Sequence, residues 1–409
     1  MNLIEDFTWR GLINQCTDLD GLGTLINNEQ VTLYCGFDPT ADSLHVGHLI
    51  PMISLLRFKK HGHNPIALIG GATGLIGDPS GKTQEREVLL ENIVINNSNS
   101  ISSQLSKITQ CQTRNNIDWT KNMSVIDFMR KVGKNFSVNS MLARDSVTSR
   151  INGGLSFTEF SYMLFQGNDF LHLATAEGCK LQIGGSDQFG NMCSGLDLLR
   201  KNQLDGFAMT FPLLTKSDGS KFGKSENGSV WLDPNKTSPW DFFQFWLNTT
   251  DVDVIKLLKL FTFLTQEEII ELEKSTITQP HLRLAQKALA KEVTTLIHGE
   301  ESCSNIQEVS QLLFSGNDFN LSSSGIELLK TIIPCSTKSI SNLSEIKQAM
   351  VETELSLSMT KATQSIKEKS VHICELGKAP IKITESQQEF SFVKPFLLKK
   401  GKKHFSLIT

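Results

Sequence analysis

The segment VTLYCGFDPTADSLHVGHL, residues 31–49, joins a short apolar run to a polar turn. The run VTLYCGF (31–37) predicts a buried strand. The turn places His45 and His48 where the chain enters a predicted helix that continues through Arg57. A strand, a turn and a helix in this order form the repeating unit of a parallel sheet, so the segment predicts an α/β fold.

Short apolar runs alternate with amphipathic helices as far as about residue 215, which is the pattern of a parallel sheet with crossover helices. Three further strands are predicted: PIALIGG (65–71), KLQIGG (180–185) and AMTFPLLT (208–215). The predicted strands lead into Gly, Asp or Ser at their carboxyl ends, where such sheets bind ligands. We therefore predict a Rossmann-like, nucleotide-binding architecture.

The length of 409 residues predicts two or three domains. We expect a Rossmann-like domain over residues 1–230, with a helical insertion at about 120–175 that can supply an oligomer surface. Apolar positions at helical spacing predict an all-α domain over 231–325. A helix, several strands and a basic turn predict a small α+β domain over 340–409.

The composition excludes several classes of protein. A hydrophobic content of 39% and a charged content of 20% fit a folded globular chain. The amino terminus lacks a basic start followed by an apolar run, so we expect a cytoplasmic protein without a membrane span. Eight cysteines form no C-x-x-C pair, and we expect no structural metal. Residues 345–409 carry 11 Lys and 7 Glu, and this positive net charge is suited to binding a polyanion.

Three segments are suited to phosphate groups. Two imidazoles at a helix start add donors to the free backbone N–H groups, although H-x-x-H alone fits a simple helix cap equally well. Five glycines within residues 70–81 precede Lys82 and Arg86 without the spacing of a P-loop, and a plain glycine-rich turn is the alternative. Lys221 and Lys224 lie in a Gly/Ser loop that can close over phosphates or simply be solvated.

The segment FSYMLFQGNDF (160–170) predicts a helix with a polar stripe. Tyr162, Gln166 and Asp169 fall at i, i+4 and i+7 and therefore share one face. A solvent-facing stripe would look similar, but the flanking phenylalanines and leucine indicate a largely buried helix. Because buried polar groups need partners, we expect the three side chains to converge on a ligand.

HVGH (45–48) and KFGKS (221–225) together resemble the HIGH and KMSKS signatures of class I aminoacyl-tRNA synthetases. The resemblance is to the bacterial tyrosyl branch, and it runs almost continuously from residue 31 to about 265. The segments that carry it are YCGFDPTADSLHVGHL, GDPSGKTQER, SFTEFSYMLFQGNDF, LQIGGSDQFGN, TKSDGSKFGKS and TSPWDFFQFWLNT. The rival interpretations are a tryptophanyl-tRNA synthetase, a small adenylyltransferase, and an RNA-binding protein built on a synthetase scaffold.

The resemblance implies an enzyme that activates L-tyrosine with ATP to tyrosyl-adenylate and pyrophosphate. It then transfers the tyrosyl group to the 3′ end of tRNA(Tyr). Mg²⁺ is expected to bind through the ATP phosphates. The domain over residues 1–230 is expected to be catalytic. The chain is expected to form a homodimer that pairs through the helical insertion. The tail is similar to an S4-type RNA-binding module, whose implied phosphate contacts are Lys399, Lys400, Lys402 and Lys403.

The resemblance also implies a role for individual residues of this sequence. The tyrosine pocket is expected to use Tyr34 and Asp169 for the phenolic hydroxyl, Asp78, Tyr162 and Gln166 for the α-ammonium group, and Gln188 near the reacting groups. The expected triphosphate contacts are Thr40, His45, Lys82, Arg86, Lys221 and Lys224. The remaining expected ATP contacts are His48, Cys35, Gly36, Asp38, Gly185, Asp187 and Ser225.

Overall fold

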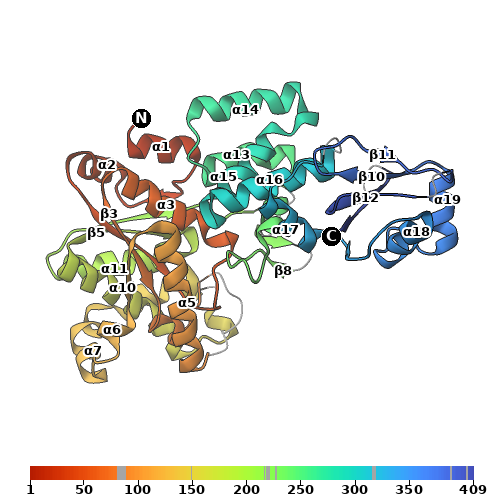
Figure 1. Ribbon diagram of the computed structural model, residues 1–409. Coiled ribbons are helices and arrows are strands. Elements are labelled where there is room, and N and C mark those ends of the chain that lie inside the picture. The colour runs from red at the N-terminus through yellow and green to blue at the C-terminus, as the bar shows by residue number, and fades with distance from the viewer. Residues whose placement is uncertain are drawn as a thin grey trace. The chain divides into compact units, whose positions relative to one another are not determined.

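The computed structural model describes the chain except for residues 81–88, 149, 216, 218–221, 226–227, 316–318, 387–388 and 402–403. The chain forms two compact units, Met1–Val293 and Thr294–Thr409 (Figure 1). None of the helices in the described ranges has both the length and the apolar character needed to cross a membrane.

The first unit is built on a sheet whose strand order, over the described residues, is β1-β6-β5-β2-β3-β4. The strands are β1 (Gln15–Cys16), β2 (Thr32–Phe37), β3 (Asn64–Ile69), β4 (Gln112–Asn115), β5 (Cys179–Gly185) and β6 (Phe207–Phe211). All pairings are parallel except that of β1 with β6. The Rossmann-like parallel sheet is therefore confirmed, while β1 and β4 were not predicted.

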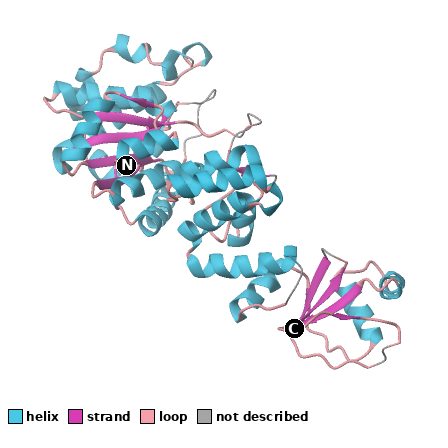
Figure 2. Cartoon of the chain, turned by 90° about the horizontal axis from the view of Figure 1, so that it is seen from above, coloured by secondary structure: helices cyan, strands magenta, loops and turns pink. Residues whose placement is uncertain are grey.

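Helices cover both faces of this sheet (Figure 2). Those before the insertion are α1 (Leu3–Arg10), α2 (Leu19–Asn28), the 3-10 turn η1 (Val46–His48), α3 (Leu49–Lys60), α4 (Thr73–Ile76) and α5 (Glu91–Thr109). Because crossovers are right-handed, α3 and α5 lie on one face, and helices that precede or follow β5 lie on the other. The crossovers from β2 to β3 and from β5 to β6 run in opposite directions, so the topological switch point lies between β2 and β5.

Short helices separate β4 from β5, where a helical insertion was predicted. They are α6 (Ile117–Thr120), α7 (Val125–Lys131), η2 (Gly133–Asn135), α8 (Val138–Leu142), α9 (Asp145–Thr148) and η3 (Ile151–Gly153). The long helix α10 (Phe157–Glu177) follows, and after β5 come η4 (Ser186–Gln188) and α11 (Phe189–Lys201). Phe170 of α10 and Met192 of α11 pack with Tyr34 in one buried cluster, which places α10 and α11 over the face that carries Tyr34.

The first unit continues with a short hairpin and a set of helices. The hairpin pairs β7 (Lys224–Ser225) with β8 (Gly228–Ser229). The helices are α12 (Pro239–Leu247), α13 (Asp251–Phe261), α14 (Gln266–Thr278), η5 (Pro280–Leu282) and α15 (Leu284–His298), of which α15 extends past the unit boundary. This helical run agrees with the pattern predicted after residue 231.

The second unit contains a small sheet in the order β11-β10-β12-β13-β9, counted over the residues described. Its strands are β9 (Cys335–Ser336), β10 (Val371–Glu375), β11 (Ile381–Lys382), β12 (Phe396–Lys400) and β13 (His404–Ile408). Its helices are α16 (Glu300–Ser315), α17 (Ser323–Ile332), α18 (Leu343–Glu352) and α19 (Met359–Lys367). Side chains of α18 and α19 form one buried core with β10 and β12, which confirms a small sheet domain at the carboxyl end.

Candidate active site

A cavity of about 280 Å³ opens at the carboxyl ends of β2 and β5, the switch point of the larger sheet. It brings together most of the predicted site residues that the structure describes. Those that line it are Tyr34, Cys35, Gly36, Asp38, Thr40, His48, Asp78, Tyr162, Gln166, Asp169, Gly185, Asp187 and Gln188. These residues come from strands, loops and helices separated by up to about 150 positions, so the fold assembles the cavity from one end of the sheet.

Several predicted residues do not line this cavity. The ring of His45 lies beside those of His48 and Trp231, with centroid distances of 4.2 and 5.9 Å. Lys82, Arg86 and Lys221 lie outside the described residues, as do Lys402 and Lys403 of the tail. Lys224 and Ser225 form β7, but their side chains are not described.

Tyr34 presents a buried phenol to one end of the cavity. The residue is 1% exposed, and its hydroxyl has no hydrogen-bond partner within the part of the chain that the structure describes. Burial, followed by the nearby charge of Asp169, raises the Tyr34 pKa well above its ordinary value. The hydroxyl is therefore neutral and can donate a hydrogen bond to a ligand.

Asp169 lies at the same end of the cavity and is 3% exposed. Its carboxylate accepts hydrogen bonds from Asn116 Nδ2 and Trp119 Nε1, both at 2.9 Å. Burial raises the Asp169 pKa to about 7, although these two hydrogen bonds act in the opposite direction. Because each carboxylate oxygen can accept more than one hydrogen bond, Asp169 can also accept one from a ligand hydroxyl.

A second polar group, the carboxamide of Gln182, lines the cavity beside Tyr34. Gln182 pairs with Tyr34 in the register of β5 with β2 and is 3% exposed. Its Oε1 has no hydrogen-bond partner among the described residues. Buried polar groups are nearly always hydrogen-bonded, so an orphaned oxygen at a cavity wall indicates a ligand. Sequence analysis missed this residue, whose only signal was one amide within the apolar run KLQIGG.

Asn116 and Trp119 were also missed. Asn116 directly follows β4 and donates to Thr73 Oγ1 at 3.1 Å as well as to Asp169. The ring of Trp119 stacks on His172, with centroids 4.2 Å apart. These contacts hold the Asp169 carboxylate from two sides. The available signal was the position of Asn116 at the carboxyl end of a strand, which required β4 to be recognised.

The cavity is also lined by two further carboxylates, Asp38 and Asp78. Asp78 accepts from Gln188 Nε2 at 2.7 Å and from the Ser80 backbone N–H at 2.9 Å. Asp38 accepts from the Tyr162 hydroxyl at 3.1 Å. The Gln166 Oε1 has no partner in the described part of the chain. Two carboxylates and a free amide oxygen can accept hydrogen bonds from an ammonium group.

His48 of the HVGH turn also lines the cavity. The His45 backbone N–H donates to His48 Nδ1 at 3.2 Å, which leaves the proton of a neutral His48 ring on Nε2. Burial, followed by His45, lowers the His48 pKa to about 3, so the ring is neutral at physiological pH. Gly36 lines the same wall, and a Cβ there would meet no atom within 4 Å. Its bare backbone therefore gives a ligand room to approach.

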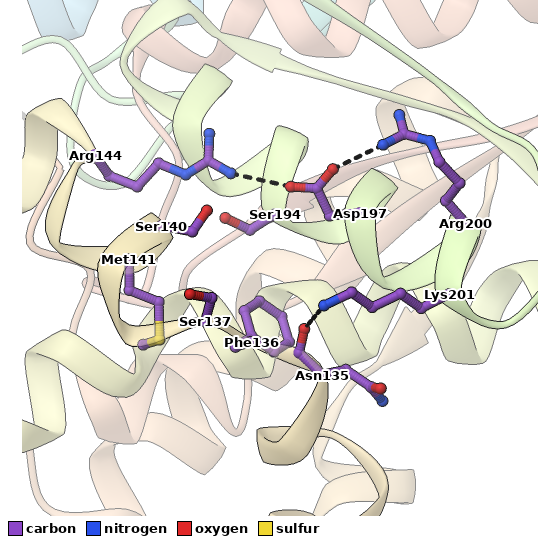
Figure 3. Close-up of a pocket in the computed structure, with 10 residues that line it drawn as sticks. All are labelled: Asn135, Phe136, Ser137, Ser140, Met141, Arg144, Ser194, Asp197, Arg200 and Lys201. Carbon is purple, nitrogen blue, oxygen red and sulfur yellow. Dashed lines mark hydrogen bonds and ion pairs between the residues drawn. The ribbon is translucent and has the colours of Figure 1, made fainter.

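A second cavity, of about 230 Å³, lies between the insertion and α11 (Figure 3). Its charged groups bind one another: Asp197 contacts Arg144 at 3.4 Å and Arg200 at 2.9 Å, and Lys201 donates to the Asn135 carbonyl oxygen. None of the predicted site residues lines it. These contacts hold the insertion against α11.

Comparison with known proteins identifies the family. The family described as class I tRNA synthetases (W and Y) matches residues 26–315. The chain is 48% identical to the tyrosine–tRNA ligase of Bacillus velezensis, over 100% of this chain and 99% of that protein. The chain belongs to the tyrosyl branch of the class I tRNA synthetases. The tyrosine–tRNA ligase 1 of Bacillus subtilis is also 48% identical, with the same coverage.

Solved structures of class I synthetases agree with this family. A truncated mitochondrial tyrosyl-tRNA synthetase of Aspergillus nidulans is similar with a TM-score of 0.70 and 32% identity, over 76% of this chain and 94% of that chain. The tryptophanyl-tRNA synthetase of Plasmodium falciparum has a TM-score of 0.55 at 14% identity, covering 73% of this chain and 84% of that one, which shows the shared fold alone. The prediction of a tyrosyl-branch class I synthetase is thus confirmed.

Proposed function

We propose that the chain activates L-tyrosine with ATP and then transfers the tyrosyl group to the 3′ end of tRNA(Tyr). The observation that carries this proposal is the pairing of Tyr34 and Asp169 at one buried end of the cavity. A phenolic hydroxyl bound there can donate to Asp169 and accept from Tyr34. Phenylalanine lacks this hydroxyl, so its binding leaves the buried Tyr34 hydroxyl without a partner, at a cost of about 1–3 kcal/mol, and forfeits the additional hydrogen bond to Asp169.

The rest of the cavity suits the remainder of the substrate. Asp78, Tyr162 and Gln166 surround the space next to the phenol end, where they can bind the α-ammonium group. The tyrosine carboxylate then lies toward Gln188 and the HVGH turn. We assign His48 Nε2–H to the ATP ribose, and Gly36 and Gly185, which line the same cavity, to further contacts with ATP.

In the first step, a tyrosine carboxylate oxygen attacks the α-phosphorus of ATP. A bond forms between that oxygen and the phosphorus, and the bond from the phosphorus to the bridging oxygen breaks, releasing pyrophosphate. The carboxylate is already ionised at neutral pH, so the reaction needs alignment and charge stabilisation more than a general base. We assign the triphosphate to Thr40, His45, Lys82, Arg86, Lys221 and Lys224. Cys35 and Asp187 are assigned to the ATP ribose, and Asp38 and Ser225 to other contacts with ATP. Mg²⁺ enters as part of the substrate, bound to phosphate oxygens.

We propose a homodimer that pairs through the insertion. This part of the chain exposes large apolar side chains on α7, α8 and the start of α10. The strongly exposed ones are Val125 (75%), Ile126 (71%), Val138 (61%) and Phe157 (70%). Exposed apolar side chains gathered in one region mark an interaction surface, and a two-fold dimer buries the same surface on both subunits.

We assign catalysis to residues 1–230, the helical domain to 231–325, and tRNA binding to an S4-like domain at 340–409. Lys399 lies over the Phe405 ring at 5.4 Å. Lys400 Nζ donates to the Leu355 carbonyl oxygen at 3.0 Å, so it also supports the fold of this unit.

All eight cysteines are free, which agrees with a reducing compartment, and we propose a cytoplasmic enzyme.

The test is amino-acid-dependent exchange of pyrophosphate into ATP, measured with tyrosine, phenylalanine and tryptophan. We expect exchange with tyrosine, and its collapse in Asp169→Ala at a temperature where the variant is folded. Exchange that depends on tryptophan, or no exchange with any amino acid, would contradict the proposal.

A further inference from the structure

Two buried arginines from different helices bind the carboxyl end of α13. Arg10 on α1 donates to the carbonyl oxygens of Lys259, Thr262 and Leu264 at 3.0, 3.2 and 2.7 Å. Arg57 on α3 also donates to the Thr262 carbonyl oxygen. Both side chains are 4% exposed. The last carbonyls of a helix lack partners within the helix and carry its negative dipole end, so cations stabilise them.

Asp6 joins the two guanidinium groups. It accepts from Arg10 Nε at 2.7 Å and from Arg57 Nη1 at 3.0 Å. Burial, followed by the charge of Arg10, lowers the Arg57 pKa to about 10, so the group stays protonated at neutral pH. Arg57 thus binds Asp6 and Thr262 with different nitrogens of one rigid plane. A lysine can supply the charge but not this two-directional contact.

Arg57 joins α3, which follows the HVGH turn, to α13, which contacts Phe222 of the second signature. The α3 helix follows the HVGH turn without a break, because η1 ends at His48 and α3 begins at Leu49. The ring of Phe222 stacks on that of Phe261 at the end of α13, with centroids 5.8 Å apart. Phe261 immediately precedes the carbonyl that Arg57 binds. Figure 1 shows α3 and α13 within the first unit, where they are in contact.

Gly223 also lies against the HVGH turn. A Cβ on Gly223 would lie 3.0 Å from Val46 Cγ2, and the Gly223 φ of +89° favours glycine. The Val230 backbone N–H donates to the Gly223 carbonyl oxygen at 3.1 Å, and the Val46 N–H donates to the Val230 carbonyl oxygen at 3.0 Å.

We propose that Arg57 is a positioning residue for the ATP half of the active site. By binding the end of α13 from the HVGH helix, it fixes Phe222 and Gly223 against Val46. The inference rests on the proposed function, because it concerns how the enzyme holds ATP. It involves no residue of the tyrosine pocket, so tyrosine binding separates the two hypotheses.

The experiment compares Arg57→Met and Arg57→Lys with the wild type at a temperature where all three are folded, as judged by circular dichroism. Tyrosine binding without ATP is measured by equilibrium titration, and the KM for ATP and kcat by tyrosine-dependent pyrophosphate exchange. We expect unchanged tyrosine affinity but a loss of roughly tenfold or more in kcat/KM for ATP in Arg57→Met, because small misplacements of reacting groups are costly. Arg57→Lys keeps the charge and should retain part of the activity. This variant still tests the inference if Arg57→Met does not fold.

Arg10→Met is the matched control, because Arg10 caps the same end of α13 but comes from α1 instead of the HVGH helix. It should lower the thermal midpoint while leaving kcat/KM for ATP within about twofold of the wild type. Equal losses in the Arg10 and Arg57 variants would show a structural role only and overturn the inference. Unchanged ATP kinetics in both Arg57 variants, or an equal loss of tyrosine affinity, would also overturn it. A wild type without tyrosine-dependent exchange would instead refute the proposed function.

Discussion

Gln182 lies opposite Tyr34 in the parallel pairing of β5 with β2, and each side chain ends in a polar atom without a hydrogen-bond partner among the described residues. Both atoms are buried at the wall of one cavity. Leaving a buried polar atom unpaired costs about 1–3 kcal/mol, so two of them destabilise the empty protein. A ligand with its own polar groups removes that cost on binding.

Replacing the carboxamide of Gln182 should therefore raise the stability of the empty protein and weaken tyrosine binding. We expect Gln182→Met, which nearly conserves volume, to raise the free energy of unfolding of the empty protein by about 1–3 kcal/mol. Tyrosine affinity should fall roughly two- to tenfold, the equivalent of one hydrogen bond of about 0.5–1.5 kcal/mol. Thermal unfolding without ligand and equilibrium titration with tyrosine measure the two effects.

Ser54→Ala is the control for this variant. The Ser54 hydroxyl is likewise buried and without a partner in the described structure, but Ser54 does not line the cavity. Its removal should stabilise the protein and leave tyrosine affinity unchanged. A Gln182→Met protein that is less stable and binds tyrosine as tightly as the wild type would contradict the interpretation.

The sequence predicted those parts of the site that lie on strongly patterned elements. Tyr34 stands within an apolar strand, and Asp169 on a helix whose polar positions repeat at helical spacing, so both elements could be predicted from the pattern. The assignment of both side chains to one phenolic hydroxyl came from the resemblance to tyrosyl-tRNA synthetases. The strand β4 has the sequence QTRN and is half exposed at the sheet edge, so no apolar run marks it. Asn116 and Trp119, which depend on β4 for their placement, were missed for this reason.

Other features depend on register and contacts that a sequence pattern does not contain. Gln182 lies in a predicted strand, but only the pairing with β2 shows that it shares the cavity face with Tyr34. Asp38 was expected near ATP by resemblance, and its carboxylate accepts from the Tyr162 hydroxyl of the tyrosine-binding stripe. Arg57 was predicted only as the end of a helix. Its contact with Thr262 joins residues 205 positions apart.

The raised pKa of Asp169 predicts how stability depends on pH. Burial raises this pKa from 3.8 to about 7, so the folded state binds the proton more tightly than the unfolded state. The stabilising effect of protonation is complete below about pH 4 and is lost as pH rises through about 7. Compared with Asp169→Asn, which does not titrate, the wild type should therefore lose roughly 2–3 kcal/mol between pH 5 and pH 8. Thermal unfolding of both proteins without ligand measures the difference.

Asp127→Asn provides the control for the pH series. Asp127 lies on α7 with a half-exposed side chain, and Ser124 and Lys131 lower its pKa below the ordinary value. Its ionisation is complete at both pH 5 and pH 8, so the difference from the wild type should not change over this range. A difference between Asp169→Asn and the wild type that stays constant with pH would show that the buried carboxyl is not protonated near neutral pH.

The exposed apolar side chains of the insertion predict that a single charge there disrupts the dimer. Phe157 begins α10 and is 70% exposed, so Phe157→Glu should not alter the core of the subunit. At a two-fold interface the substitution places a carboxylate in the apolar contact on both subunits, where burial of an unpaired charge is unfavourable. We expect light scattering to give a particle of twice the chain mass of 45.5 kDa for the wild type and one chain mass for the variant. Leu357→Glu, at a position that is 91% exposed in the second unit, should leave the wild-type mass unchanged. If Phe157→Glu remains a dimer while the wild type is one, the subunits pair through another surface.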